Sequence, residues 1–94
     1  MKARDYFNAI SYGYENGVER PGNQWTDRAL RALINQANKT GDCVISGRGR
    51  YYKPISDREE EAQDSRIYFA KELHRARDIL YKRKMMMETY RMLK

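Results

Sequence analysis

Hydrophobic residues recur with the period of an α-helix between residues 26 and 39. Four of them follow the spacing i, i+3, i+4, i+7 that marks one buried helix face: Leu30, Leu33, Ile34 and Ala37. Thr26 is suited to cap the first turn, and Gly41 is suited to end the helix. The pattern therefore predicts a helix from Thr26 to Lys39, with Trp25 just before it stapling its start to the core.

A β-hairpin is predicted directly after this helix. Residues 43–46 favour a strand, residues 47–50 hold two glycines and favour a turn, and Tyr51-Tyr52 returns as a second strand that Pro54 ends. Cys43 is expected to be a small core residue in the first strand. Because a lone hairpin is marginally stable in water, we expect it to pack on the apolar face of the preceding helix.

The chain on either side of this unit differs in character. Residues 3–14 are weakly helical, and residues 15–24 have the composition of a loop, with two glycines, two asparagines and a proline. Ser56 and Glu59 fit a capping box, and neither proline nor glycine interrupts residues 55–94. A final helix of about 30 residues or more is therefore expected. These segments, 1–24, 25–54 and 55–94, are expected to form one domain.

A row of apolar residues runs along the predicted final helix. Six residues keep a 4-3 spacing, which Arg83 interrupts at one position: Phe69, Leu73, Ala76, Leu80, Met87 and Tyr90. This row, called the seam below, predicts a helix–helix contact. We expect part of the seam to cover the domain, and the remainder to meet a second copy, giving a homodimer, or to fray.

Charge narrows the classes of partner. The chain has 94 residues and a net charge of +6, and between residues 20 and 53 seven Lys and Arg stand against two Asp and Glu. This balance favours nucleic acid, anionic membrane or acidic protein as partners. A single cysteine excludes an internal disulfide, no apolar run reaches the roughly 20 residues of a membrane span, and the N-terminus lacks the apolar core of a signal peptide. A cytoplasmic protein that does not enter the membrane is the expectation.

The polar face of the helix after Trp25 is the main candidate site. At 100° per residue, five residues fall within about 80° of one another: Gln24, Arg28, Arg31, Asn35 and Lys39. Arginine pairs with guanine, and asparagine or glutamine with adenine, so this face is suited to base edges and phosphates of double-stranded DNA. An ordinary solvated helix face is the alternative.

The hairpin tip, Gly47-Arg48-Gly49-Arg50, is the second candidate. Glycines let backbone N–H groups approach a phosphate, and the arginines neutralise it, so Arg48, Arg50 and the nearby Lys53 are added as candidate DNA contacts. The tip lacks the spacing of a nucleotide-binding P-loop. A turn that needs glycine, with arginines in water, is the alternative.

Other residues indicate no further chemistry. His74 is the only histidine and has no neighbouring ligand set, so neither a metal nor a cofactor is expected. The acids from Glu59 to Asp64 are typical of a helix start. The sequence shows no candidate nucleophile or acid–base pair, so neither an enzyme nor a small-molecule substrate is expected. The basic residues 75–84 favour a solvated helix end, with contact to phosphate or acidic lipid as the alternative.

Several segments together resemble a known family. Thr26–Ile34, Gly41, Val44–Ser46 and Gly49–Pro54 resemble the recognition helix and wing of small winged helix-turn-helix DNA-binding proteins from phages and mobile elements. Ser56–Glu61 and Arg75–Leu80 resemble the long helix after the wing in those proteins. The resemblance implies a mainly α (α+β) winged-helix-like fold, with a short N-terminal helix, a recognition helix, a two-stranded β-wing and a long C-terminal helix.

The resemblance also implies a function. It implies non-catalytic DNA binding in phage or mobile-element regulation, such as transcription regulation, or in replication, with Arg28, Arg31 and Asn35 on the recognition helix and Arg48 and Arg50 on the wing. The family normally has two helices before the recognition helix, and here only residues 1–25 are available. The competing hypothesis is a protein–protein interaction module that acts through the long C-terminal helix.

Overall fold

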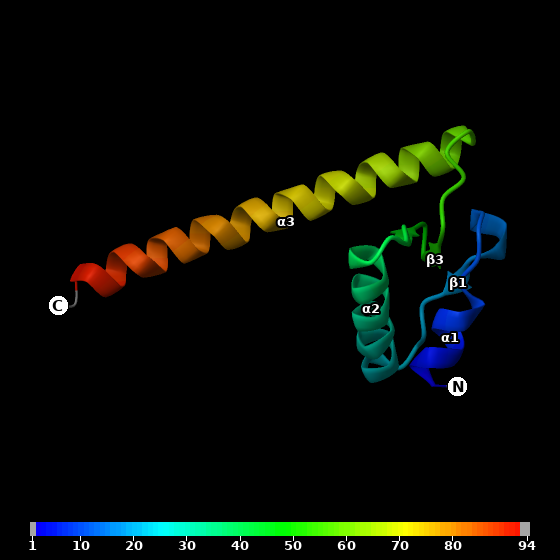
Figure 1. The fold of residues 1–94 in the computed structure, drawn as a ribbon, viewed down its shortest axis with the longest axis horizontal. Coiled ribbons are helices and arrows are strands. Elements are labelled where there is room, and N and C mark those ends of the chain that lie inside the picture. The colour runs from blue at the N-terminus through cyan, green and yellow to red at the C-terminus, as the bar shows by residue number, and fades with distance from the viewer. Residues whose placement is uncertain (1, 93–94) are drawn as a thin grey trace.

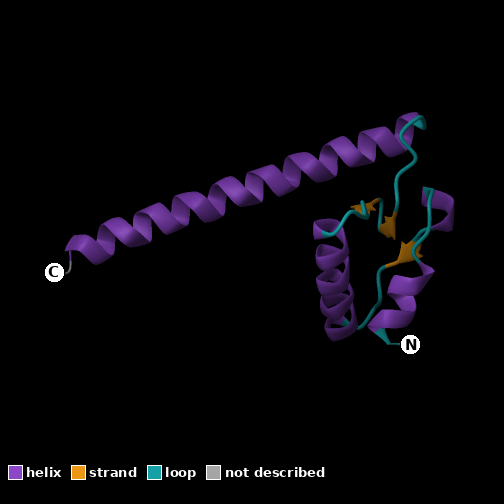
Figure 2. Ribbon diagram, in the orientation of Figure 1, coloured by secondary structure: helices purple, strands orange, loops and turns teal. Residues whose placement is uncertain are grey.

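The computed structural model describes residues 2–92 and shows a small α+β body from which one long helix projects (Figures 1 and 2). The described residues form three α-helices: α1 (Ala3–Ala9), α2 (Gln24–Lys39) and α3 (Glu59–Met92). A short 3₁₀ turn at Tyr14–Asn16 follows α1. Three strands, β1 (Val18–Glu19), β2 (Ile45–Gly47) and β3 (Arg50–Tyr52), form an antiparallel sheet in the order β1-β3-β2. Residues 1, 93 and 94 lie outside the described part of the predicted domain.

Helix α2 begins two residues earlier than predicted. Asn23 is the N-cap, and its side-chain oxygen accepts hydrogen bonds from the backbone N–H groups of Trp25 and Thr26 at 2.8 and 3.2 Å. The prediction of Thr26 as the cap is therefore wrong, since an amide one turn earlier satisfies the free N–H groups. Trp25 is 67% exposed with the Arg28 guanidinium 5.3 Å from its ring, so it does not staple the helix to the core.

The hairpin is confirmed, and a third strand joins it. Ile45 pairs with Tyr52 and Gly47 with Arg50 across a two-residue turn, Arg48-Gly49, in which both residues have positive φ, as a type I′ hairpin requires. Strand β1 pairs with the other edge of β3. The sequence predicted a loop there, because two residues are too few to show an alternating pattern.

The core lies between α2 and the sheet. Leu30, Ile34, Val44 and Tyr51 form its centre. Ala3, Tyr6 and Phe7 of α1 pack against it, as does Ile10, which directly follows α1. The predicted stripe of α2 is thus confirmed, with Leu33 half-buried at its edge. Cys43 is exposed and precedes β2, so its predicted core position is wrong. Val44 and Ile45, each 1% exposed, fill that place.

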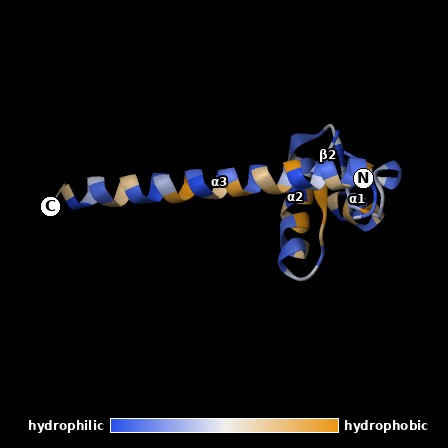
Figure 3. Ribbon diagram, turned by 90° about the horizontal axis from the view of Figure 1, so that it is seen from above, coloured by the Kyte–Doolittle hydropathy of each residue, from blue (hydrophilic) through white to orange (hydrophobic). Residues whose placement is uncertain are grey.

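Helix α3 is 34 residues long, which corresponds to about 51 Å. It begins at Glu59, three residues after Ser56, so the predicted capping box is wrong. Its buried residues are Glu61 and Asp64, and every described residue from Phe69 onward is exposed. The seam therefore does not cover the domain as expected. Figure 3 shows the helix leaving the body with polar and apolar turns both in solvent.

Candidate nucleic-acid interface

The predicted polar face of α2 lies in solvent. All five of its residues are exposed: Gln24, Arg28, Arg31, Asn35 and Lys39. An acid lies at the edge of this face, because Asp27 approaches the Arg31 Nε within 3.3 Å. The Asp27 carboxylate also accepts a hydrogen bond of 2.6 Å from the Tyr51 hydroxyl. This bond and burial raise the pKa of Tyr51 to about 12, with burial the larger cause. Asp27 thus fixes one end of the face to the sheet.

The polar face runs into the angle between α2 and α3. Arg31 and Asn35 line a hollow of about 150 Å³ together with Arg20, Tyr68 and Arg75. Figure 1 shows why this hollow forms: α3 passes close to the C-terminal end of α2 and then continues beyond it. Three guanidinium groups from three segments therefore surround one small hollow. Sequence reasoning missed Arg20 and its proximity to Arg75, because only the fold brings residues 20 and 75 together.

Arg20 is held over the sheet. Its Nη2 lies 3.4 Å from the Ser46 hydroxyl, and its guanidinium is 5.5 Å from the centre of the Tyr51 ring. Arg75 approaches Glu72 only at 3.9 Å, and its side chain is 70% exposed. Both arginines are thus accessible to an anion that enters the angle beside α2.

The hairpin tip is fastened to α3. The Arg48 Nε donates a 2.8 Å hydrogen bond to Asp64, its Nη1 lies 3.3 Å from Glu60, and its guanidinium covers the Tyr14 ring at 3.8 Å. The bond to Asp64 is the largest of the effects that raise the Arg48 pKa. A Cβ on Gly47 would lie 3.0 Å from the Asp64 carboxyl carbon, so glycine permits this close approach. The tip is thus a contact between the sheet and the first turns of α3.

The other two predicted cations of the wing also contact the body. Arg50 donates a 3.1 Å hydrogen bond to the Tyr14 carbonyl oxygen and lies 3.9 Å from Glu19. Lys53 lies 3.7 Å from Asp42. The tip therefore sits beside Tyr14 and the start of α3, whereas Arg31 and Asn35 sit beside Tyr68 and Arg75 further along that helix. Arg48 and Arg50 thus do not line the hollow that holds Arg31 and Asn35, whereas Lys53 lies beside Asp42, which lines a hollow together with Asn35 and Lys39.

Two acids that were predicted to be ordinary helix-start charges are buried and accept hydrogen bonds. Asp64 accepts a 2.6 Å hydrogen bond from the Tyr52 hydroxyl in addition to the bond from Arg48. Glu61, 3% exposed, accepts bonds from the Ile55 N–H at 2.9 Å and from Arg58 at 3.0 Å. Their spacing of three residues, followed by Tyr68 four residues later, is the only sequence signal that they share a body-facing row.

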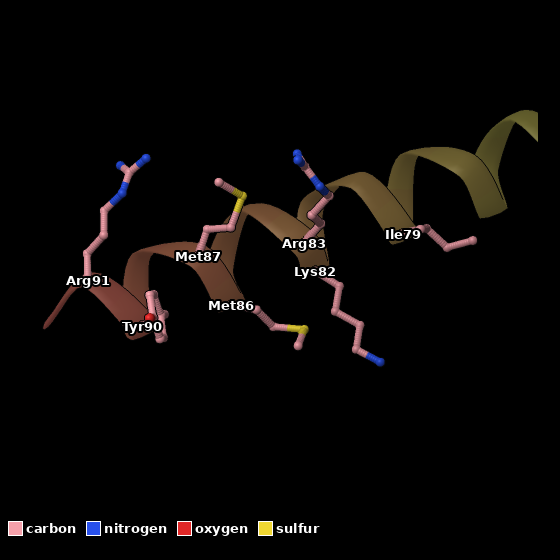
Figure 4. A pocket seen from close by; sticks show the side chains of 7 residues that line it. All are labelled: Ile79, Lys82, Arg83, Met86, Met87, Tyr90 and Arg91. Atoms are coloured by element: carbon pink, nitrogen blue, oxygen red, sulfur yellow. The ribbon is translucent and has the colours of Figure 1, made fainter. Parts of the chain in front are cut away.

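The apolar residues of α3 form a second exposed feature. Leu73, Leu80 and Met87 of the seam are 53%, 63% and 41% exposed. An open groove of about 570 Å³, which includes Met87 and Tyr90 of the seam, runs along the outer turns. Ile79, Lys82 and Met86 point to one side of the helix, and Arg83, Met87 and Arg91 point to the other (Figure 4).

Comparison with known proteins gives no assignment: no family profile, curated protein or solved structure matches this chain. Among residues 2–92, no three His, Cys, Asp or Glu side chains are grouped so that they could hold a metal ion. Within the same residues, no helix has both the length and the apolar character needed to cross a bilayer.

Proposed function

We propose that this protein binds double-stranded DNA without catalysis, through the exposed polar face of α2. The observation that carries the proposal is that Gln24, Arg28, Arg31, Asn35 and Lys39 all stay exposed on one face of a helix whose other face is anchored in the core. A rigid helix that presents arginine and amide groups together can enter a major groove and read base edges.

The order of elements supports a winged-helix-like interpretation. A helix, a short strand, a second helix and a hairpin follow one another, and β3 lies between β1 and β2. On this interpretation α2 is the recognition helix, and the helix that normally precedes it is replaced by the turn at residues 20–23. The resemblance to phage and mobile-element proteins makes regulation or replication of such DNA in the cytoplasm the proposed setting.

Fewer of the proposed DNA contacts lie on the wing than the sequence predicted. Arg48 and Arg50 would have to leave Asp64 and Tyr14 before they could neutralise a phosphate. Arg20 and Arg75 lie in the angle beside α2 and take their place as phosphate contacts. With Arg28, Arg31 and Lys39 they make five cations, which predicts a salt slope of about −4.5 for each copy bound.

Fluorescence anisotropy with labelled duplex fragments tests the proposal. Arg28→Ala together with Asn35→Ala should weaken binding at least tenfold and reduce sequence preference, since each good base contact contributes about 1–3 kcal/mol. Arg66→Ala is the matched control, because Arg66 is an exposed arginine near the start of α3 and pairs with Glu59. Equal affinity of the wild type and the α2 variant, or a slope near zero, would reject the proposal.

A protein-interaction module is the second candidate, and the exposed apolar residues of α3 favour it. Surface apolar groups in a continuous row mark sites of association more often than isolated ones do. A protein partner that the wild type binds and a seam variant loses, with no binding of duplex DNA by the wild type, would favour this candidate over DNA binding.

A further inference from the structure

We propose that the hollow in the angle between α2 and α3 binds one phosphate monoester group. Arg20, Arg31 and Arg75 all line this hollow, although they come from three separate segments of the chain. Its volume of about 150 Å³ is below the roughly 300 Å³ at which pockets for drug-sized ligands begin, so it fits a small anion and not a whole nucleotide. Positive charges that converge on one small space repel one another, and a bound anion removes that repulsion.

Two of the three arginines are held in place by the body. The Arg20 Nη2 lies 3.4 Å from the Ser46 hydroxyl, and the guanidinium stands 5.5 Å from the centre of the Tyr51 ring. The Arg31 Nε lies 3.3 Å from Asp27. A guanidinium carries several N–H donors, so each arginine keeps donors for a ligand beside the one that holds it. An anion therefore meets side chains that are already oriented, which lowers the entropic cost of binding.

The number of arginines favours a monoester over a backbone phosphate of DNA. A backbone phosphate has two free oxygens and a sugar on either side, whereas a monoester has three free oxygens and one substituent. Guanidinium groups from three segments can each bond a separate oxygen of a monoester. Glu72 is the one acid among the described residues that line the hollow, so the lining keeps an excess of positive charge. This excess suits the greater negative charge of a monoester.

A phosphate in this hollow also joins α3 to α2. The side-chain bonds that fasten α3 to the body come from Glu60, Glu61 and Asp64 in its first turns. Arg75 lies about 16 Å beyond Asp64 along the helix axis. An anion held by both Arg31 and Arg75 is therefore a second attachment of α3, at a distance from the first.

The inference deepens the proposed function, because the proposed DNA interface includes Arg20, Arg31 and Arg75. DNA carries a phosphate monoester at the 5′ end of a strand. If the protein binds DNA, the hollow receives such a terminal phosphate while the polar face of α2 lies on the adjoining duplex. Only this source of the phosphate rests on DNA binding, and the affinity for the group itself does not.

An NMR titration of the full chain with inorganic phosphate, at constant ionic strength in sodium chloride, tests the site. The Nε–Hε signals of Arg20, Arg31 and Arg75 should shift together and saturate in the millimolar range, and dimethyl phosphate should bind about tenfold more weakly or worse. Arg75→Ala should raise the dissociation constant for phosphate about tenfold or more. Arg77→Ala is the matched control, because it removes the same charge from an exposed residue about 200° around α3 and should change nothing.

Three results would overturn the site: no saturable shift, equal affinity for dimethyl phosphate, or equal loss in the two variants. Circular dichroism checks that both variants keep their fold. Glu72→Gln supplies a change of the opposite sign, because it removes a negative charge from the lining. It should tighten phosphate binding about threefold or more. Unchanged or weaker binding by this variant would also contradict the site.

Fluorescence anisotropy with duplexes that carry or lack a 5′ phosphate tests the source. The phosphorylated duplex should bind the wild type more tightly, and Arg75→Ala should remove the difference. Binding of inorganic phosphate without a preference for the phosphorylated duplex would overturn the strand end as the source and support a free monoester. Binding of duplex DNA without any binding of inorganic phosphate would overturn the site and leave the proposed function standing.

Discussion

Asp64 offers the most direct test of how the sheet is attached to α3. Its carboxylate accepts a 2.6 Å hydrogen bond from the Tyr52 hydroxyl and a 2.8 Å bond from the Arg48 Nε. Tyr52 is fully buried, and Asp64 is 9% exposed. Asp64→Ala leaves the Tyr52 hydroxyl without this acceptor in a place that water reaches poorly, so the lost bond is not replaced.

The magnitude follows from the buried bond. A hydrogen bond to a charged acceptor contributes about 1.5–3 kcal/mol. We therefore expect Asp64→Ala to lower the free energy of unfolding by about 2 kcal/mol through Tyr52 alone. The whole free energy of unfolding of a small domain is about 5–15 kcal/mol, so this loss is a large fraction of the stability.

Urea denaturation followed by circular dichroism measures this loss of stability. A double-mutant cycle tests whether the loss comes from the bond between Asp64 and Tyr52. Tyr52→Phe removes only the hydroxyl, so Asp64→Ala should cost less in that background, with a coupling of about 1 kcal/mol or more. Glu59→Ala is the control, because Glu59 is an exposed acid near the same end of α3. Additive effects of the two substitutions, or a loss no larger than that of Glu59→Ala, would refute the assignment.

Two further predictions concern the ends of α2 and α3. Asn23→Ala should lower the free energy of unfolding by about 1 kcal/mol, because two N–H groups of α2 lose their acceptor; urea denaturation measures it, and no loss would contradict the cap. Burial acts to raise the pKa of Glu61, but the bonds from the Ile55 N–H and Arg58 outweigh it and hold that pKa below 4.5. A carboxyl with a lowered folded pKa stabilises the fold above its unfolded pKa, so stability should fall as pH drops below about 4.5. Glu61→Gln should flatten that fall in urea denaturation at a series of pH values, and an unchanged slope would contradict the prediction.

Sequence reasoning succeeded where a long element carries its own periodic signal. The apolar stripe of α2 repeats over two turns, and its buried members are Leu30, Ile34 and Ala37. The uninterrupted stretch after Pro54 predicts a helix of about 30 residues, and α3 spans 34. The hairpin was found because the glycines on either side of Arg48 mark a tight turn.

Prediction failed where an element or side chain depends on a distant partner. Strand β1 exists because β3 offers it a free edge, which its two residues cannot show by themselves. Arg48 was assigned to phosphate because its neighbours in sequence are glycines, but in the fold its neighbours are Asp64 and Tyr14. The exposed face of α2 could be read from spacing alone, whereas the contributions of Arg20 and Arg75 to the same angle required the fold.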